Sequence, residues 1–222
     1  MRLLRSYLFA PGNDEGLLGK AFRAGADAVV LDLEDAVPES EKSRARTCVS
    51  EALASETSSS AGGGPPVVFV RINGLDSAHW RLDVDAVLGP SISGIRVPKV
   101  ESLDSLCRLH DTLSERERML GLAPGSFSVV ATIETARGLA RVDSLARAPR
   151  LWGFTFGAAD FSADVSADPD DHTATLYARS TLVTFSRAHR LSPPVAAVFT
   201  RLNDDEGLRV DTERQKGLGA TR

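Results

Sequence analysis

The sequence predicts an α/β fold built on a parallel sheet. Short apolar runs rich in β-branched residues alternate along the chain with longer amphipathic stretches. The runs are apolar on both faces, which is typical of strands buried within a parallel sheet. Seven strand–helix units at this spacing suit either a doubly wound sheet or a (β/α)8 barrel.

Each element follows from its local pattern. The first strand ends at Pro11-Gly12-Asn13, a turn sequence that caps a helix beginning at Asp14. The predicted strands, in chain order, are residues 7–10, 28–33, 67–72, 93–97, 128–133, 152–156 and 195–199. The predicted helices lie near residues 14–24, 39–54, 80–88, 101–118, 136–147, 172–190 and 204–216.

The chain is expected to form a single domain over residues 1–222, since no shift in composition marks a boundary. Residues 55–66, with the sequence SETSSSAGGGPP, are of low complexity. This composition predicts a flexible loop between the second helix and the third strand.

Composition excludes several classes of function. The 222 residues are 42% hydrophobic with a net charge of −4, so the chain has no basic excess to hold a nucleic acid backbone. No run approaches the eighteen consecutive apolar residues of a membrane span, and no signal peptide is evident at the first residues. The two cysteines lie far apart, which disfavours a disulfide framework or a cysteine zinc site. We therefore expect a cytoplasmic protein.

Charged side chains interrupt or follow five of the apolar strands at their carboxyl ends. In residues 28–35, strand periodicity places Asp32 and Glu34 on one face. Ligands bind at this end of parallel strands, in barrels and open sheets alike. One such residue alone would indicate a helix cap or a surface ion pair, but charged residues at five strand ends together predict a site. The residues concerned are Asp32 and Glu34, Arg71, Lys99, Glu134 and Asp160.

The residue types predict a magnesium site. Carboxylates brought to one rim of the sheet repel one another. A hard cation between them, with the positive charges of Arg71 and Lys99 nearby, would offset this repulsion. Carboxylate oxygens without histidine or thiolate favour Mg²⁺ over zinc. Arg71 has the planar fork that captures a substrate carboxylate through two hydrogen bonds.

Several motifs in their order along the chain resemble the citrate lyase β-subunit group of the HpcH/HpaI aldolase superfamily. The resemblance covers nearly the whole chain, and the DLEDAV and ETARG signatures are its most specific parts. The motifs are SYLFAPGN from Ser6, DLEDAV from Asp32, VRIN from Val70, PK at Pro98, IETARG from Ile133, GAAD from Gly157 and EGL from Glu206.

This resemblance implies a TIM (β/α)8-type barrel that cleaves or forms a carbon–carbon bond with Mg²⁺. The substrates would be 3-hydroxyacyl thioesters such as citryl-, malyl- or citramalyl-CoA, and the products a 2-oxo acid and an acyl thioester. Carried over to this chain, Glu134 and Asp160 would bind the metal. Arg71 would bind the carboxylate of the oxo acid. Asp32, Glu34 and Asp35 would shape the substrate pocket and surround the metal ligands.

A basic stretch after the second predicted strand suggests that the thioester is carried by CoA. Lys42 and Arg46 resemble residues that meet CoA phosphates in similar proteins. The alternative interpretation is a solvated helix face. A CoA-independent aldolase acting on small 2-oxo acids would leave this basic pair without a role.

The chain also departs from the family pattern. The resemblance implies an eighth strand and a C-terminal lid segment, and we expect the barrel to lack both, because the sequence supplies seven strand-like runs and ends at Arg222. Such a barrel exposes unpaired strand edges. The family favours a homo-oligomer, a trimer or a hexamer, and a non-catalytic or partner-dependent subunit with a degenerate barrel stays an alternative to the lyase.

Overall fold

The computed structural model describes residues 4–56, 65–168 and 171–220. Six strands hydrogen bond in the order β1-β2-β3-β4-β5-β6, and β1 to β4 pair in parallel. This confirms the predicted α/β class with a parallel sheet. The strands are β1 (Tyr7–Pro11), β2 (Ala28–Asp32), β3 (Val67–Arg71), β4 (Gly94–Val97), β5 (Ser128–Ile133) and β6 (Leu151–Phe156).

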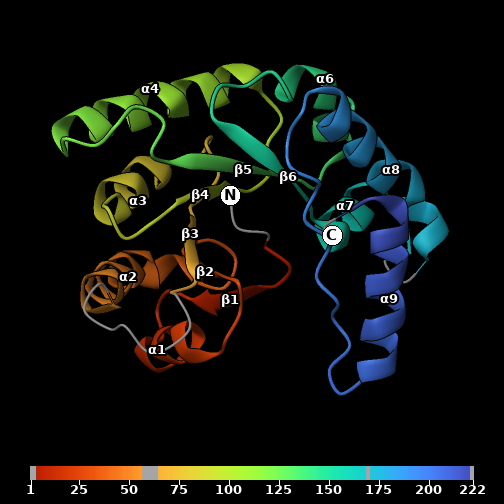
Figure 1. Ribbon diagram of the computed structural model, residues 1–222, viewed down its shortest axis with the longest axis horizontal. Helices are drawn as coiled ribbons and strands as arrows, with labels where there is room; N and C mark the ends of the chain where they lie inside the picture. Colours follow the sequence, from red (N-terminus) through yellow and green to blue (C-terminus); the bar gives the residue numbers. More distant parts are fainter. Residues whose placement is uncertain (1–3, 57–64, 169–170, 221–222) are drawn as a thin grey trace. The chain divides into compact units, whose positions relative to one another are not determined.

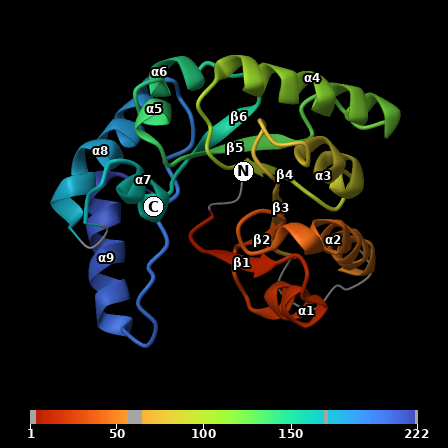
Figure 2. The ribbon, with the colours of Figure 1, turned by 180° about the vertical axis from the view of Figure 1, so that it is seen from behind.

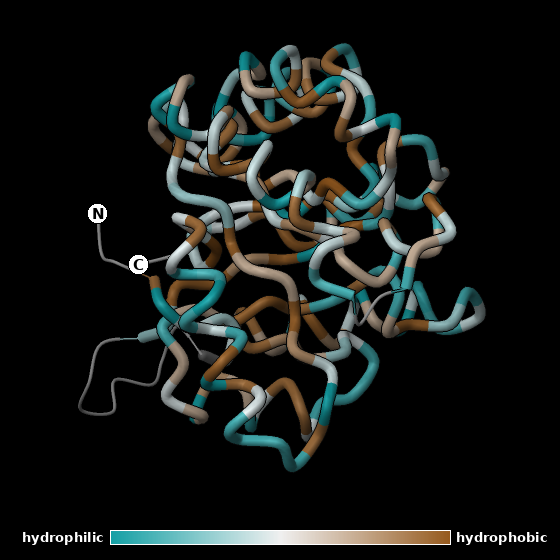
Figure 3. Tube along the Cα trace, turned by 90° about the vertical axis from the view of Figure 1, so that its right-hand side faces the viewer, coloured by the Kyte–Doolittle hydropathy of each residue, from teal (hydrophilic) through white to brown (hydrophobic). Residues whose placement is uncertain are grey.

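The helices alternate with these strands along the chain. Hydrophilic and hydrophobic residues alternate along the trace (Figure 3). The helices are α1 (Glu15–Arg23), the short 3₁₀ helix η1 (Glu39–Glu41), α2 (Lys42–Glu56), α3 (Trp80–Val87), α4 (Leu103–Met119), α5 (Ala136–Leu139), α6 (Val142–Leu145), α7 (Ala158–Asp164), α8 (His172–Ala188) and α9 (Asp205–Leu218). No helix in the described ranges has the length and apolar character needed to cross a membrane.

The chain divides into two compact units. Unit 1 comprises Met1–Val97 and Leu109–Val129, and unit 2 comprises Pro98–Arg108 and Val130–Arg222. Helix α4 and strand β5 contribute residues to both units. The single-domain organisation stays a prediction.

Unit 1 is built around the strands β1 to β4. All residues of β2 and β4 are buried, as the apolar character of both strand faces predicts. Helices α1 and α2 pack beside each other next to β1 and β2 (Figures 1 and 2). Asp14 caps α1 by accepting a hydrogen bond from the Leu17 N–H, at 2.9 Å. The helix therefore begins one residue later than predicted.

Unit 2 centres on α8, which packs against β6, α5, α6, α7 and α9 (Figure 1). The predicted helix over 136–147 is two short helices instead, because Arg141 between them leaves the helical conformation with φ −111° and ψ 7°. Helix α7 was not predicted, because its seven residues are too short to show a periodic pattern.

The seventh predicted strand, over residues 195–199, is wrong. Val195 forms an isolated parallel bridge with Thr155, and Val198 is exposed. Pro193 and Pro194 precede the bridge and have no N–H to donate, which shortens any ladder there. Of the predicted loop at 55–66, residues 55 and 56 belong to α2, and residues 57–64 lie outside the described part of the chain.

Candidate functional site

The predicted site residues form one cluster in each unit. In unit 1, Asp32, Glu34, Asp35 and Arg71 make the β2–β3 cluster. In unit 2, Lys99, Glu134 and Asp160 make the β5–α7 cluster. Each cluster lies at the ends of strands. There the sequence changes from apolar to polar residues.

The β2–β3 cluster is organised by the register of its two strands. Asp32 and Arg71 are partners in the parallel β2–β3 ladder, each as the last residue of its strand. The Asp32 carboxylate accepts hydrogen bonds from Arg71 Nε at 2.7 Å and Arg71 Nη2 at 2.6 Å. This bidentate pair is the strong, directional form of an arginine–carboxylate interaction.

Two further carboxylates share the same guanidinium. Glu34 Oε2 lies 3.0 Å and Asp35 Oδ2 3.3 Å from Arg71 Nη1. Burial disfavours the charged form of Arg71, but the hydrogen bonds and negative charges of Asp32, Glu34 and Asp35 outweigh it and raise the pKa of the guanidinium. One arginine faces three acidic groups, so the cluster carries an excess of negative charge when all three are ionised.

Asp32 also shapes the loop that follows β2. The residue is 1% exposed, and the two oxygens of its side chain accept hydrogen bonds from the backbone N–H groups of Glu34 at 2.9 Å and Ala36 at 3.1 Å. Both oxygens therefore hold the loop and Arg71 at once. The position of Arg71 thus depends on the same carboxylate that folds the DLEDAV motif.

Lys42 and Arg46 lie in unit 1 and have partners of their own. The Lys42 ammonium is buried and donates to the carbonyl oxygens of Leu33 at 2.8 Å and Glu34 at 2.7 Å. Arg46 Nη1 donates to the buried carboxylate of Asp83 at 3.1 Å. The solvated-face alternative is therefore wrong for Lys42, because its side chain turns inward to hold the end of β2.

The structure also reveals functional candidates that the sequence argument missed. Arg96 on β4 is 1% exposed and lies over the Phe9 ring, 5.1 Å from its centroid, while Arg71 lies 5.4 Å from the same ring. Arg71 and Arg96 are partners in the β3–β4 ladder. The sequence feature that could have pointed to Arg96 is a charged residue within a short apolar run, between Gly94 and Pro98.

In unit 2, Glu134 follows β5 and is buried. Its Oε1 accepts a hydrogen bond from the backbone N–H of Lys99 at 2.7 Å. Lys99 has a φ of 49°, in the left-handed region that non-glycine residues rarely adopt. Such strained positions cluster at functional sites, where the surroundings hold them in place.

Lys99 also joins the two predicted metal ligands. Its ammonium lies 3.7 Å from Asp160 Oδ2, and Asp160 occupies the first turn of α7. Lys99 thus contacts Glu134 through its backbone and Asp160 through its side chain. The carboxylates of Glu134 and Asp160 are not accompanied by a third acidic, histidine or cysteine ligand, since the described residues contain no group of three or more that could hold a metal ion.

Gly157 leaves the room that the Glu134 side chain occupies. A Cβ at position 157 would overlap the Glu134 carboxylate and would lie 2.6 Å from Glu134 Cβ. The φ of Gly157 is −92°, which an alanine tolerates. The requirement for glycine here is therefore one of space.

Gly157→Ala is expected to lower the free energy of unfolding by about 1–3 kcal/mol, the usual cost of inserting a methyl group where no space is left for it. Urea denaturation would measure it. Gly217→Ala is the matched control in the same unit, since nothing lies within 4 Å of its added Cβ, and alanine in a helix interior stabilises by up to about 1 kcal/mol. Equal stability of the Gly157 variant and the unmodified protein would contradict the packing seen around Glu134.

Comparison with known proteins gives a consistent result. The model of the family described as HpcH/HpaI aldolase/citrate lyase matches residues 5–222. The chain is 35% identical to citrate lyase subunit beta of Leuconostoc mesenteroides subsp. cremoris, over 98% of this chain and 71% of that protein. It is 33% identical to L-malyl-CoA/beta-methylmalyl-CoA lyase of Cereibacter sphaeroides, over 97% of this chain and 72% of that protein.

A solved structure extends the likeness to the fold. The crystal structure of the protein CitE from Mycobacterium tuberculosis in complex with magnesium, acetoacetate and coenzyme A is similar with a TM-score of 0.78 and 26% sequence identity. The match covers 100% of this chain and 76% of that chain.

Proposed function

Because the chain belongs to the HpcH/HpaI aldolase/citrate lyase family, we propose that it is a Mg²⁺-dependent carbon–carbon lyase acting on a 3-hydroxyacyl-CoA thioester. The reaction cleaves the thioester into a 2-oxo acid and an acyl-CoA, or joins the two in reverse. The observation that carries the proposal is the pair of carboxylates Glu134 and Asp160, which Lys99 contacts through its backbone N–H and its ammonium.

The donors of the β5–α7 cluster fit Mg²⁺. This ion takes one or two protein carboxylates and keeps several waters or substrate oxygens as its other ligands. Glu134 is buried and fixed by Lys99 and Gly157, whereas the Asp160 side chain is 45% exposed. Glu134 therefore supplies a rigid ligand and Asp160 an accessible one. When bound, Mg²⁺ polarises substrate oxygens and stabilises the negative charge that develops on them.

The partner of the Lys99 ammonium depends on whether the β5–α7 cluster holds a metal ion. Its ammonium lies against Asp160, where it offsets part of the charge of the carboxylates. An exposed pair at 3.7 Å is weak, worth about 0–1 kcal/mol, so Asp160 is readily released to another cation. The freed ammonium of Lys99 then binds an anionic group of the substrate.

Arg71 is proposed to bind the carboxylate of the oxo acid. Its Nε and one Nη2 hydrogen are used by Asp32, which leaves the Nη1 edge facing Glu34 and Asp35. Asp35 is the most exposed of the three acidic residues and its oxygen is the most distant. A substrate carboxylate would therefore replace Asp35, while Asp32 keeps the guanidinium in place. Glu34 and Asp35 limit the site to groups that compete with them for Arg71.

The proposal that CoA carries the thioester is supported by relatives such as the L-malyl-CoA/beta-methylmalyl-CoA lyase of Cereibacter sphaeroides. We propose that Lys42 and Arg46 lie on the path of the CoA phosphates. A phosphate would have to compete with the backbone carbonyls that Lys42 holds and with Asp83, the partner of Arg46. We further propose a cytoplasmic homo-oligomer, a trimer or a hexamer, as the family resemblance implies.

A coupled assay tests the function. The purified chain is expected to release glyoxylate, pyruvate or oxaloacetate from malyl-, citramalyl- or citryl-CoA in the presence of Mg²⁺, and EDTA is expected to stop the release. Succinyl-CoA, which has no 3-hydroxyl group to become a carbonyl, is the control and should yield no oxo acid. A folded chain that binds Mg²⁺ but turns over none of the three thioesters would overturn the proposal and favour a partner-dependent subunit.

A further inference from the structure

A series of buried hydrogen bonds in unit 1 joins helix α3 to the loop that follows β2. Asp83 on α3 is 0% exposed. Its Oδ2 accepts hydrogen bonds from the backbone N–H of Asn73 at 2.8 Å and from Asn73 Nδ2 at 2.7 Å. Its Oδ1 accepts one from Arg46 Nη1 at 3.1 Å. The carboxylate therefore fixes both the main chain and the side chain of Asn73, two residues beyond Arg71.

The Asn73 amide carries this restraint to the loop. One hydrogen of Nδ2 is used by Asp83, and Nδ2 also donates to the carbonyl oxygen of Leu33 at 3.0 Å. The same peptide unit presents the N–H of Glu34, which donates to Asp32 Oδ1 at 2.9 Å. Because a peptide unit is planar, the direction of the Leu33 carbonyl also sets the direction of the Glu34 N–H.

The series ends on Arg71. Asp32 Oδ1 accepts the hydrogen bond from Glu34 and a second one from Arg71 Nε at 2.7 Å. Hydrogen-bonded partners of this kind fix the orientation of a binding group without touching its ligand. We call the series the Asp83 relay; its members, in order, are Asp83, Asn73, the Leu33–Glu34 peptide unit, Asp32 and Arg71.

The relay also has a place in the state with the thioester bound. Lys42 donates to the same Leu33 carbonyl at 2.8 Å, and Arg46 contacts Asp83. In the proposed function, a CoA phosphate competes with the partners of both basic side chains. When Lys42 is drawn away, Asn73 still holds the Leu33 carbonyl, and when Arg46 is drawn away, Asp83 keeps both hydrogen bonds to Asn73. The relay therefore holds the loop whether or not CoA is bound.

We propose that Asp83 is a positioning residue of the oxo-acid site, which acts on Arg71 through the Asp83 relay. The inference rests on the proposed function, in which Arg71 binds the carboxylate of the oxo acid. Asp83 has no exposed surface and does not itself contact the substrate. Its effect is on the orientation of the guanidinium, and a small misplacement of a binding group is enough to weaken the interaction with the substrate by up to about a hundredfold.

Hydrogen exchange tests the relay independently of activity. Asp83→Asn keeps the shape of the side chain but replaces one accepting oxygen with an NH₂ group, so that one of the donors loses its acceptor. The backbone N–H of Glu34 is expected to exchange about tenfold faster or more, because its peptide unit is held less firmly. Asp85→Asn is the matched control, since Asp85 lies on the same helix and also pairs with an arginine, Arg116, at 2.7 Å, but is exposed.

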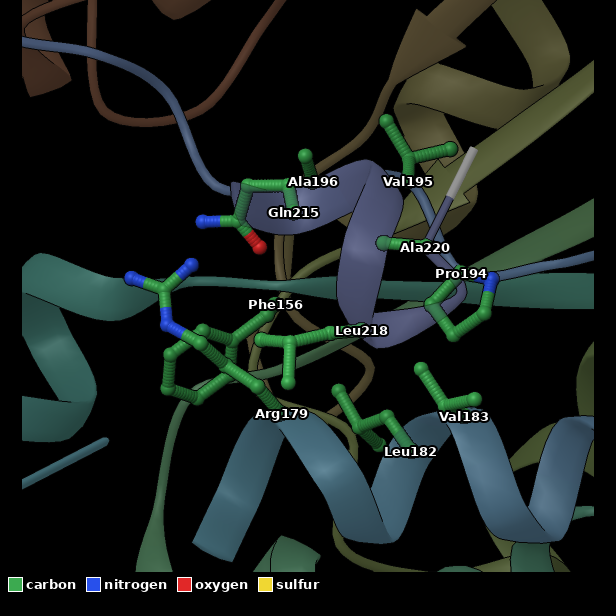
Figure 4. Close-up of a pocket in the computed structure, with 10 residues that line it drawn as sticks. All are labelled: Phe156, Arg179, Leu182, Val183, Pro194, Val195, Ala196, Gln215, Leu218 and Ala220. Carbon is green, nitrogen blue, oxygen red and sulfur yellow. The ribbon is translucent and has the colours of Figure 1, made fainter. Parts of the chain in front are cut away.

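Leu182→Ala distinguishes the relay from a general loss of stability. Leu182 is 1% exposed and lines a pocket of only about 10 Å³ between α8 and α9 in unit 2 (Figure 4), so its truncation destabilises the fold through lost apolar contacts. At equal free energy of unfolding, set with urea, Glu34 N–H is expected to exchange faster in Asp83→Asn than in Leu182→Ala. Asn73→Ser keeps the backbone bond to Asp83 and gives the same result at Glu34 if Asp83→Asn does not fold.

Condensation kinetics test whether the relay serves the oxo-acid site. The substrates are acetyl-CoA and whichever of glyoxylate, pyruvate and oxaloacetate the unmodified chain condenses with it. In Asp83→Asn, KM for the oxo acid is expected to rise about tenfold to a hundredfold. KM for acetyl-CoA is expected to stay equal or fall, because the carboxylate that competes for Arg46 is gone. General damage to the fold would raise both.

The inference is overturned if Glu34 N–H exchanges at the same rate in Asp83→Asn as in Leu182→Ala at equal stability. It is also overturned if KM for the oxo acid is the same in Asp83→Asn and Asp85→Asn. An unmodified chain that condenses no oxo acid contradicts the proposed function, and with it the role of the relay in oxo-acid binding, while the exchange rate of Glu34 N–H separately decides whether Asp83 holds the loop.

Discussion

Asp160→Ala is expected to slow Mg²⁺-dependent cleavage by about a hundredfold to a thousandfold while leaving the fold intact. In the proposed site, the substitution removes one of the two carboxylates that would bind the metal. Loss of such a contact, which stabilises charge in the transition state, costs about 2.7–4 kcal/mol, which corresponds to this decrease in rate. The structure gives the reason why the fold survives. The Asp160 side chain is nearly half exposed, and its ion pair with Lys99 at 3.7 Å contributes little to stability.

Asp205→Ala is the matched control for this substitution. Asp205 also lies in the first turn of a helix in unit 2 and is exposed, so both variants lose the favourable interaction of a carboxylate with a helix N-terminus. The measurements are the rate of oxo acid release and the affinity for Mg²⁺ by titration, with circular dichroism as the check on folding. Full activity of Asp160→Ala at limiting Mg²⁺ would remove Asp160 from the metal site.

The strands could be predicted because a strand that is buried on both faces consists almost entirely of apolar residues. Both faces of β2 and β4 are covered, so their runs are apolar without interruption. The segment at 195–199 has the same composition, but it pairs only at Val195, and this depends on the two prolines and on neighbours that a local pattern does not contain. Helix α7 went unpredicted for a related reason, since a helix of two turns is held by its surroundings more than by its own periodicity.

The candidate site divides in the same way. Asp32 and Arg71 could be singled out because a charge at the end of an apolar run is visible in the sequence, and the ladder then makes them partners. The direction of a long side chain is not visible. The sequence predicts that Lys42 meets a CoA phosphate, or else lies on a solvated helix face, yet its four methylenes carry the ammonium back to the carbonyls of Leu33 and Glu34. The pairing of Arg46 with Asp83 likewise joins helices α2 and α3, which no local spacing indicates.

Arg71→Lys is expected to reduce kcat/KM by about a hundredfold or more, although the positive charge is kept. Lysine offers a compact ammonium in place of a planar fork. It can follow Asp32 or a substrate carboxylate, but it cannot reproduce the two parallel hydrogen bonds at 2.7 and 2.6 Å and keep an Nη1 edge for a second carboxylate. The loss of a charge-assisted contact in the transition state has the magnitude seen for oxyanion-stabilising donors, about 2.7–4 kcal/mol.

The division between KM and kcat in this variant distinguishes binding from chemistry. If Arg71 holds the oxo acid equally in the ground state and the transition state, KM for the oxo acid in the condensation direction rises and kcat is retained; if it also stabilises the developing oxyanion, kcat falls as well. Arg23→Lys, an exposed position on α1, is the control and should change neither. Unchanged kinetics in Arg71→Lys would show that the arginine serves only to fold the loop around Asp32, because a lysine charge is sufficient to offset the acidic residues but not to hold a carboxylate in one orientation.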